Sequence, residues 1–173
     1  AEISKHLSKN KKNVIFDVGS FRGNFTKGLI KEENKINLSS YYYLFDPNPR
    51  SSTYISELLK FNKNINYYNL ALHKNNEQKI FFLNNFFEGA GSSFQTIIKD
   101  DFLWNFTRRI FVQFFYLFQF KMTRGYTEIK VNVSSLDTFC KKNNVEKIDL
   151  LKIDCEGHEK EILEGTSNLF EKK

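Results

Sequence analysis

Short apolar runs recur along this chain, and several of them are followed by a helical pattern. The first run shows this arrangement. Val14–Val18 is mostly apolar and β-branched, which predicts a strand buried on both faces. Gly19 and Gly23 bracket a turn after it, and Asn24–Ile30 has the pattern of a beginning helix. A strand, a glycine turn and a helix N-terminus form a polar pocket in which backbone N–H groups can face a ligand. The same pattern also fits a tight turn without a ligand.

The remaining runs continue this alternation. Strands are predicted at Tyr41–Phe45, Ile65–Leu72, Lys79–Leu83, Glu128–Val133 and Ile148–Ile153. Helices are predicted from Asn48-Pro49 to Phe61, at Leu136–Lys142 and at His158–Glu164. The polar turn Lys74–Glu77 makes Lys79–Leu83 a candidate hairpin partner of the strand before it. Strands separated by helices predict βαβ units, and hence an α/β fold with a mostly parallel sheet.

Composition and charge place the chain among globular proteins. It has 173 residues, of which 40% are hydrophobic and 16% aromatic, so a single domain over residues 1–173 is expected. The net charge of +6 is spread along the chain without a basic stripe, which argues against nucleic acid as a partner. Cys140 and Cys155 form neither a disulfide framework nor a metal-ligand spacing. Since Ala1–His6 lacks the apolar core of a signal peptide, a reduced, cytoplasmic setting is expected.

Polar residues stand where three of the predicted strands end. In a parallel sheet, ligands bind beyond the carboxyl ends of the strands. The Gly19–Gly23 turn, Asp46 and Asp154 all follow directly on a strand. Asp46 can accept hydrogen bonds from both hydroxyls of a ribose, or it can serve only as a turn residue before Pro47. Asp17 lies inside the first strand, where it faces a ligand, braces the loop or forms a plain buried ion pair.

The spacing of the glycines narrows the range of ligands that the turn can bind. The dinucleotide fingerprint is Gly-x-Gly-x-x-Gly, whose middle glycine lets the backbone approach a pyrophosphate. This chain has Gly-x-x-x-Gly at Gly19 and Gly23 and lacks that middle glycine. A nucleoside without a pyrophosphate therefore fits better than NAD, and an NAD-dependent oxidoreductase with a Rossmann fold stays as an alternative.

Six short segments carry the most specific signal, through their order along the chain. They are Asp17–Thr26, Phe45–Pro49, Asn69–Leu72, Gly89–Ser93, Ser135–Phe139 and Ile148–Glu159. Together they resemble the ordered motifs of the FkbM-family methyltransferases, over Val14–Phe170. The resemblance implies a Rossmann-like class I methyltransferase fold with helices on both faces of the sheet, and S-adenosyl-L-methionine as the methyl donor. It also implies O-methylation of a hydroxyl group on a sugar, a glycan or a natural product.

The resemblance also assigns roles by position. The candidate cofactor-binding residues are Asp17, Gly19, Ser20, Phe21, Gly23, Asp46, Ala71 and Leu72. The Gly19–Gly23 loop would hold the methionine part of the cofactor and Asp46 its ribose. Ala71 and Leu72 would flank the adenine. The chain departs from the usual family pattern at Ser20-Phe21, where Ala-Asn is frequent, and at Asp46, where Glu is more usual.

Three residues after the last predicted strand can handle a proton: Asp154, Glu156 and His158. The resemblance places Asp154 and Glu156 at the transfer site. A hydroxyl acceptor must lose a proton, which a carboxylate or an imidazole can take, and we rank Asp154 before Glu156 and Glu156 before His158 as that base. The two carboxylates can instead hold a divalent cation that orients the acceptor. A solvated first helical turn is the alternative for Glu156 and His158.

A strongly aromatic segment, Phe102–Phe120, lies between the Gly89–Ser93 motif and the predicted strand Glu128–Val133 and belongs to none of the motifs. It is too short, and too interrupted by arginine nearby, to span a bilayer. It belongs to a predicted insertion over about residues 95–127. Three roles are open: a cap over the acceptor pocket, a homodimer surface, or an element at a membrane interface. In the last case the protein is peripheral to a membrane and the acceptor is a lipid-linked glycan.

Two expectations concern the protein as a whole. A complete class I methyltransferase sheet has strands beyond the one that ends at Asp154, so the chain would be C-terminally truncated. The open edge would then need a cover, supplied by a continuing chain, the insertion or a second subunit. Besides the oxidoreductase, the other alternative to a methyltransferase is a non-catalytic, membrane-associated domain of the same fold.

Overall fold

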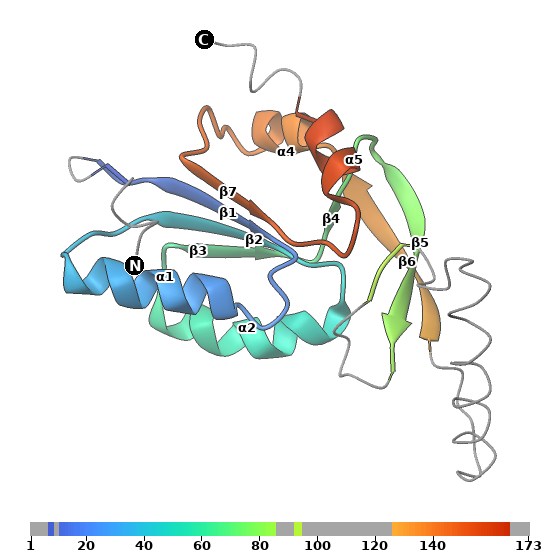
Figure 1. Cartoon of the computed structure of the whole chain (residues 1–173), viewed down its shortest axis with the longest axis horizontal. Helices are drawn as coiled ribbons and strands as arrows, with labels where there is room; N and C mark the ends of the chain where they lie inside the picture. Colours follow the sequence, from blue (N-terminus) through green and yellow to red (C-terminus); the bar gives the residue numbers. More distant parts are fainter. Residues whose placement is uncertain (1–6, 9–10, 86–91, 95–125, 167–173) are drawn as a thin grey trace, which may run out of the picture.

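Two β-sheets flanked by helices form the frame of the molecule in a computed structural model that describes residues 7–8, 11–85, 92–94 and 126–166 (Figure 1). The larger sheet has the strand order β3-β2-β1-β7, and every pair in it is parallel. Its strands are β1 (Val14–Val18), β2 (Tyr41–Phe45), β3 (Ile65–Tyr68) and β7 (Leu150–Ile153). The predicted α/β fold with a mostly parallel sheet is confirmed.

The strands of the larger sheet end level with one another. Val18, the last residue of β1, pairs with Phe45 of β2 and with Ile153 of β7. Phe45 in turn pairs with Tyr68 at the end of β3. The residues that follow these strands therefore start from one edge of the sheet.

The two longer helices, α1 (Asn24–Lys35) and α2 (Pro49–Phe61), pack on one face of the larger sheet (Figure 1). The core on this face consists of the buried side chains Leu7, Ile15, Leu29, Leu38, Tyr42, Leu44, Ile55 and Ile65. Asn48 caps α2 as predicted, because its side-chain oxygen accepts a hydrogen bond from the Arg50 N–H at 3.0 Å. Pro49 occupies the first turn of this helix, where it costs no hydrogen bond.

Two shorter helices, α4 (Leu136–Lys142) and α5 (Glu159–Glu164), pack on the opposite face (Figure 1). Side chains alternate along a strand, so Phe16 points to this face whereas Ile15 points to the other. The Phe139 ring of α4 lies edge-on to the Phe16 ring, with the ring centroids 5.9 Å apart. Helices on both faces of the sheet are therefore confirmed.

The smaller sheet has the strand order β4-β6-β5. Its strands are β4 (Ala71–Leu72), β5 (Glu77–Asn84) and β6 (Tyr126–Ser134). The prediction of one strand over Ile65–Leu72 is wrong, because that segment is divided between the two sheets and turns where the Leu70 N–H donates to the Tyr68 carbonyl at 2.8 Å. The predicted hairpin is also wrong, since β6 lies between β4 and β5 and pairs antiparallel with β5. These pairings depend on tertiary context, for which strand propensity gives no local signal.

Part of the predicted insertion is a strand. β6 begins at Tyr126, so the last residues of the predicted insertion, about 95–127, form the start of a strand of the smaller sheet. The rest of that segment, which includes Phe102–Phe120, lies outside the described residues, as do Gly89–Gly91 of the predicted glycine-serine loop. Within the described ranges, the structure contains no apolar helix of the length needed to cross a membrane.

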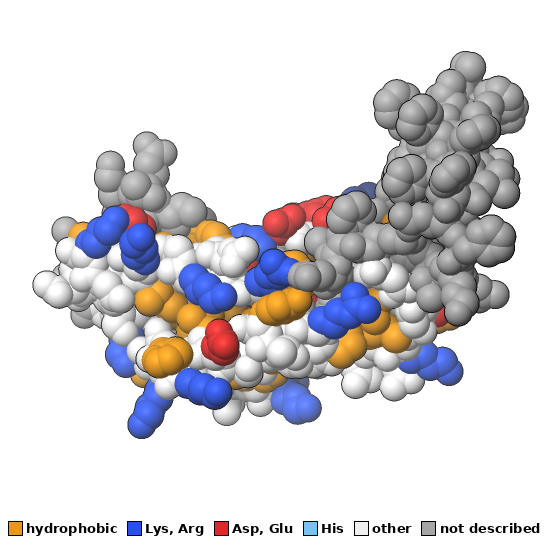
Figure 2. All heavy atoms as spheres, turned by 90° about the horizontal axis from the view of Figure 1, so that it is seen from below, with side chains coloured by type: hydrophobic (Ala, Val, Ile, Leu, Met, Phe, Trp, Pro, Cys, Tyr) orange, Lys and Arg blue, Asp and Glu red, His pale blue; other side chains and the backbone are white. Residues whose placement is uncertain are grey.

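Two expectations about the molecular surface stay predictions. In the described part of the chain β7 is an edge strand of the larger sheet, and a cover over its outer side stays a prediction. Figure 2 shows Lys and Arg side chains scattered among polar and hydrophobic ones on the face that it displays. That distribution agrees with the spread of charge along the sequence, and the absence of a nucleic-acid partner remains an expectation.

Candidate functional site

A cavity of about 190 Å³ lies beyond the carboxyl ends of β1, β2 and β7. Residues from the smaller sheet and from the segment 92–94 complete its walls. The predicted site residues that line it are Gly19, Phe21, Asp46, Ala71, Leu72, Asp154, Glu156 and His158. The structure therefore brings residues from four separate sequence motifs to one hollow.

The remaining predicted site residues, Asp17, Ser20 and Gly23, are not among those that line the cavity. Ser20 is buried, and its hydroxyl lies 3.4 Å from the Phe45 carbonyl oxygen, to which it donates. Gly23 directly precedes α1 with a φ of 69°, and a Cβ atom on it would lie 3.3 Å from the Leu58 side chain of α2. Ser20 and Gly23 thus hold the loop after β1 against its neighbours.

Gly19 is required by the approach of the β7 backbone. Its φ of 74° lies in the left-handed region that favours glycine. A Cβ atom at this position would lie 2.0 Å from the carbonyl oxygen of Asp154. Gly19 therefore permits a close contact between the backbone that follows β1 and the backbone that follows β7.

The N–H groups of the loop after β1 point into the protein. The Gly19 and Ser20 N–H groups both donate to the Phe45 carbonyl oxygen, at 2.9 and 3.0 Å. The Phe21 N–H donates to a carboxylate oxygen of Asp46 at 2.7 Å. The expectation that the loop N–H groups face a ligand is wrong for these three, since the end of β2 already supplies their acceptors. Phe21 is itself among the residues that line the cavity.

Asp46 is the buried carboxylate of the cavity. One of its oxygens accepts the hydrogen bond from Phe21, and the other accepts the Asn48 N–H at 2.8 Å. Burial raises the pKa of Asp46, although both N–H groups act in the opposite direction. A carboxylate offers about four lone-pair sites. The side chain therefore keeps acceptor capacity for the hydroxyl groups of a ligand.

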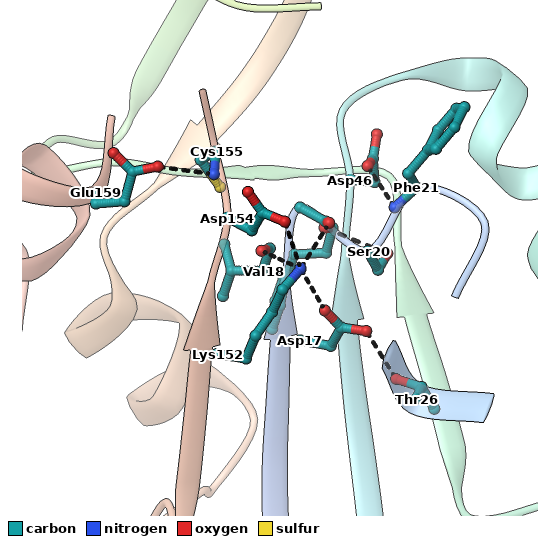
Figure 3. Close-up of polar contacts among 12 residues, drawn as sticks. Asp17, Val18, Ser20, Phe21, Thr26, Asp46, Lys152, Asp154, Cys155 and Glu159 are labelled. Atoms are coloured by element: carbon teal, nitrogen blue, oxygen red, sulfur yellow. Dashed lines mark hydrogen bonds and ion pairs between the residues drawn. The ribbon is translucent and has the colours of Figure 1, made fainter. Parts of the chain in front are cut away.

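Lys152 of β7 connects the loop after β1 to the sheet (Figure 3). Its ammonium nitrogen lies 3.1 Å from Asp17 Oδ1 and 3.1 Å from the Gly19 carbonyl oxygen. Asp17 is fully buried, and its second oxygen accepts the Thr26 hydroxyl at 2.8 Å. Of the alternatives for Asp17, the structure shows a buried ion pair, which at the same time braces the loop.

Asp154 and Glu156 stand at exposed positions on the rim of the cavity. The Asp154 side chain is 75% exposed and lies 3.7 Å from the Lys152 ammonium nitrogen (Figure 3). Glu156 is exposed and has a φ of 53°, an unusual conformation for a residue with a side chain. These two carboxylates are open to water and are not held by the packing around them.

Glu159 and Cys155 stabilise the turn after β7. The Glu159 carboxylate accepts the Cys155 N–H at 3.0 Å (Figure 3). It also accepts the Gly157 N–H at 3.3 Å. Hydrogen bonds from the backbone N–H groups of Glu159 itself and of Cys155 hold the pKa of Glu159 below its usual range. Burial raises the pKa of the Cys155 thiol to about 12, so this thiol stays protonated and is a poor nucleophile.

His158 differs from the two carboxylates because it is buried, with 5% of its surface exposed. It stands directly before α5, and its Nδ1 atom is buried without a hydrogen-bond partner among the described residues. The Phe94 ring lies 5.2 Å from the His158 ring, centroid to centroid, and also lines the cavity. Sequence analysis did not identify Phe94, although the predicted glycine-serine motif directly before it is a signal that points there.

Part of the cavity wall is apolar. Ala71 and Leu72 of β4 are buried at 5% and 2% exposure and line the cavity together with Leu70 and Phe81. Such a surface suits a flat, weakly polar group such as a nucleobase. The cavity therefore combines an apolar wall, a buried carboxylate at Asp46 and a histidine.

The described residues offer no support for a bound cation. Among them, no three His, Cys, Asp or Glu side chains are placed to hold a metal ion together. Asp154 and Glu156 alone supply too few ligands for a protein-held Ca²⁺ site.

A family model described as the methyltransferase FkbM domain matches residues 17–173 of the chain. The matched residues include every residue that lines the cavity. Comparison with curated proteins and with solved structures gave no match.

Proposed function

The chain belongs to the FkbM methyltransferase family, and from this premise we propose that it transfers a methyl group from S-adenosylmethionine to a hydroxyl oxygen of a sugar, a glycan or a natural product. The observation that carries the proposal is the cavity that joins Asp46, the β4 wall and the turn after β7 at one sheet edge. Use of S-adenosylmethionine follows from membership of a methyltransferase family. The acceptor class follows from the resemblance of the sequence motifs.

The arrangement of the larger sheet supports a Rossmann-like class I fold. Its order β3-β2-β1-β7 runs outward from β1 through β2 and β3 and then crosses back to β7 on the other side of β1. In doubly wound sheets, ligands bind where the order reverses in this way, beyond the carboxyl ends of the strands. The cavity lies at that place, between the ends of β1 and β7.

The residues of the cavity fit the parts of S-adenosylmethionine. The Asp46 carboxylate keeps acceptor capacity for the two ribose hydroxyls, while its existing hydrogen bonds to Phe21 and Asn48 fix its orientation. Ala71 and Leu72 provide an apolar surface for the adenine. The loop from Gly19, braced by Asp17 and Lys152, borders the place for the methionine part.

When bound, S-adenosylmethionine supplies a methyl group on a positively charged sulfur. The contribution of this chain is to hold donor and acceptor in line, which provides a large part of the rate enhancement in such displacements. Its second task is to remove the proton of the acceptor hydroxyl. Asp154, Glu156 and His158 all border the cavity and are the candidates for that step.

The two alternatives predict different ligands. An NAD-dependent oxidoreductase would use the same sheet edge, but the family match and the missing middle glycine of the dinucleotide fingerprint favour the methyltransferase. A non-catalytic domain of this fold would lack cofactor binding altogether.

A thermal-shift comparison of S-adenosylmethionine with NAD tests the proposal. At a concentration 100-fold above the dissociation constant, a ligand of the native state raises the melting midpoint by roughly 5–10 °C for a chain of this size. We expect that shift with S-adenosylmethionine and none with NAD.

The Asp46→Asn variant tests the proposed ribose contact. It removes the negative charge of the carboxylate that we assign to binding the ribose hydroxyls. We expect about a tenfold or greater loss of affinity for S-adenosylmethionine, because a hydrogen bond to a charged group contributes about 1.5–3 kcal/mol. The matched control is Glu57→Gln at an exposed position of α2, which should bind like the unmodified chain. A shift with NAD alone, or an Asp46→Asn variant that binds as tightly as the control, would contradict the assignment.

A further inference from the structure

Two buried histidines, His73 and His158, contact the ring of Phe94, which lines the cavity. Phe94 lies 5.2 Å from the His158 ring and 6.1 Å from the His73 ring, centroid to centroid, and is tilted steeply to both. His73 is 3% exposed and follows β4, whereas His158 is 5% exposed and precedes α5. His158 and Phe94 line the cavity, whereas His73 is not among the lining residues. Residues 73, 94 and 158 come together only through the fold.

His158 is suited to accept a proton. A neutral imidazole carries one unprotonated ring nitrogen, which is an acceptor. His158 Nδ1 is buried without a hydrogen-bond partner among the described residues. Buried polar atoms without partners are uncommon, and a catalytic role is one of the explanations for such an atom, beside strain or an ordered water. Because the ring borders the cavity, the partner of this atom can be the acceptor hydroxyl.

Asp154 and Glu156 are less suited to this role. Both are exposed, so water competes for their oxygens, and Asp154 also lies 3.7 Å from the Lys152 ammonium nitrogen. An efficient base is held in one orientation toward the proton that it removes. His158 is held by burial and by the Phe94 ring, and the two carboxylates have no comparable support.

His73 is kept neutral by its surroundings. The Lys79 ammonium group donates to His73 Nε2 at 2.9 Å, which leaves the ring proton on Nδ1. Burial first, and then the charge of Lys79, lower the pKa of His73; of the other groups that face it, His158 acts in the same direction, while Glu161 and Glu77 oppose it. A neutral His73 adds no positive charge beside His158 at the moment when His158 takes up a proton.

We propose that His158 is the general base of the methyl transfer, and that His73, with Lys79 bonded to its Nε2, is a positioning residue that holds Phe94 against the His158 ring. This inference rests on the proposed function. It reverses the order expected from the sequence, which put Asp154 first and His158 last, and it adds His73 and Phe94 to the site.

The proposed step transfers the methyl group to the acceptor oxygen and the hydroxyl proton to His158. The acceptor oxygen forms a bond to the methyl carbon while the bond from that carbon to sulfur breaks, and the electron pair of the broken bond stays on sulfur. The hydroxyl proton moves to a ring nitrogen of His158, which becomes an imidazolium. Release of that proton to water after the product leaves returns the ring to its neutral form.

NMR titration of the histidine rings tests the inference without an acceptor. The chain has three histidines, so His73→Asn and His158→Asn variants assign every imidazole signal. Two probes are compared: S-adenosylhomocysteine, whose sulfur is uncharged, and sinefungin, which carries an ammonium group near the position of the transferred methyl. If His158 faces that position, its pKa should be lower in the sinefungin complex, because a positive neighbour disfavours the imidazolium. We expect a difference of about half a pH unit or more, as a unit charge ~6 Å away produces in water.

His73 is tested by rescue. His73→Ala removes the ring that supports Phe94, and should reduce the difference in His158 titration between the two complexes. His73→Phe restores a ring without its nitrogens and should restore the difference. The matched control, Asn75→Ala, alters an exposed position in the following turn and should have no effect.

The outcomes separate the inference from the proposed function. If neither probe binds, the methyltransferase function itself fails. If both bind and His158 titrates identically in the two complexes, His158 is not the base and only the inference fails. If the difference persists in His73→Ala, His73 is not a positioning residue.

Discussion

Lys152→Met should be among the most destabilising single changes in the larger sheet. Lys152 provides the ammonium group opposite the fully buried Asp17 carboxylate, at 3.1 Å. At an effective dielectric constant of about 20, an attraction over that distance is on the order of 5 kcal/mol. Removal of one partner of a buried pair costs about 3–5 kcal/mol, because the remaining charge stays buried without compensation.

The reverse change, Asp17→Asn, should cost less. Without the carboxylate, the Lys152 ammonium group still donates to the Gly19 carbonyl oxygen at 3.1 Å, and its side chain is 20% exposed to water. The lost hydrogen bonds to a charged group amount to about 1.5–3 kcal/mol. The double variant should be more stable than the sum of the single effects predicts, with a coupling of about 2 kcal/mol.

Urea unfolding at pH 7, followed by circular dichroism, measures all three variants. Lys27→Met on α1 is the matched control: Lys27 is exposed, so its loss should change the free energy of unfolding by less than about 0.5 kcal/mol. A loss below about 1 kcal/mol for Lys152→Met, or strictly additive single effects, would refute the reasoning and leave the contact an ordinary surface ion pair.

Two further changes test the loop and the start of β1. Gly19→Ala should lower the melting midpoint sharply and abolish cofactor binding, because its Cβ would lie 2.0 Å from the Asp154 carbonyl oxygen; calorimetry of unfolding would show no such loss if the loop can move aside. Asp149→Asn should reduce stability at pH 7 by about 1–2 kcal/mol, since Asp149 accepts the Val14 N–H at 3.0 Å and pairs with Lys147. Burial alone would raise the pKa of Asp149, but Lys147 and the Val14 N–H outweigh it and hold the pKa below its usual value. The stabilisation is therefore present above the unfolded-state pKa and lost as pH falls through the folded-state pKa, so unfolding curves of the unmodified chain and the variant should converge below about pH 4; a constant difference down to pH 2 would contradict this.

The parts of the fold that could be predicted from the sequence are those with a local cause. The apolar run Val14–Val18 and the cap at Asn48-Pro49 each depend on residues next to one another, and both are found where the pattern placed them. The place of Asp46 at a strand end depends on the same kind of signal, since a polar residue interrupts an apolar run there.

The parts that could not be predicted depend on segments far apart in the chain. Lys152 is the partner of Asp17 because β7 lies beside β1, and no sequence pattern near either residue predicts that pairing. Gly19 fits a ligand loop by its spacing, yet the atom that excludes a side chain there belongs to Asp154. His73 gave no signal at all, since it enters the site only through the packing of the smaller sheet against α5.

Isothermal titration calorimetry with S-adenosylhomocysteine tests the central claim most directly, because this product-like ligand binds without turnover and needs no acceptor. We expect saturable binding of one molecule per chain, with NAD giving no heat beyond dilution. The absence of any binding heat for S-adenosylhomocysteine, from a chain whose circular dichroism shows that it is folded, would contradict this claim.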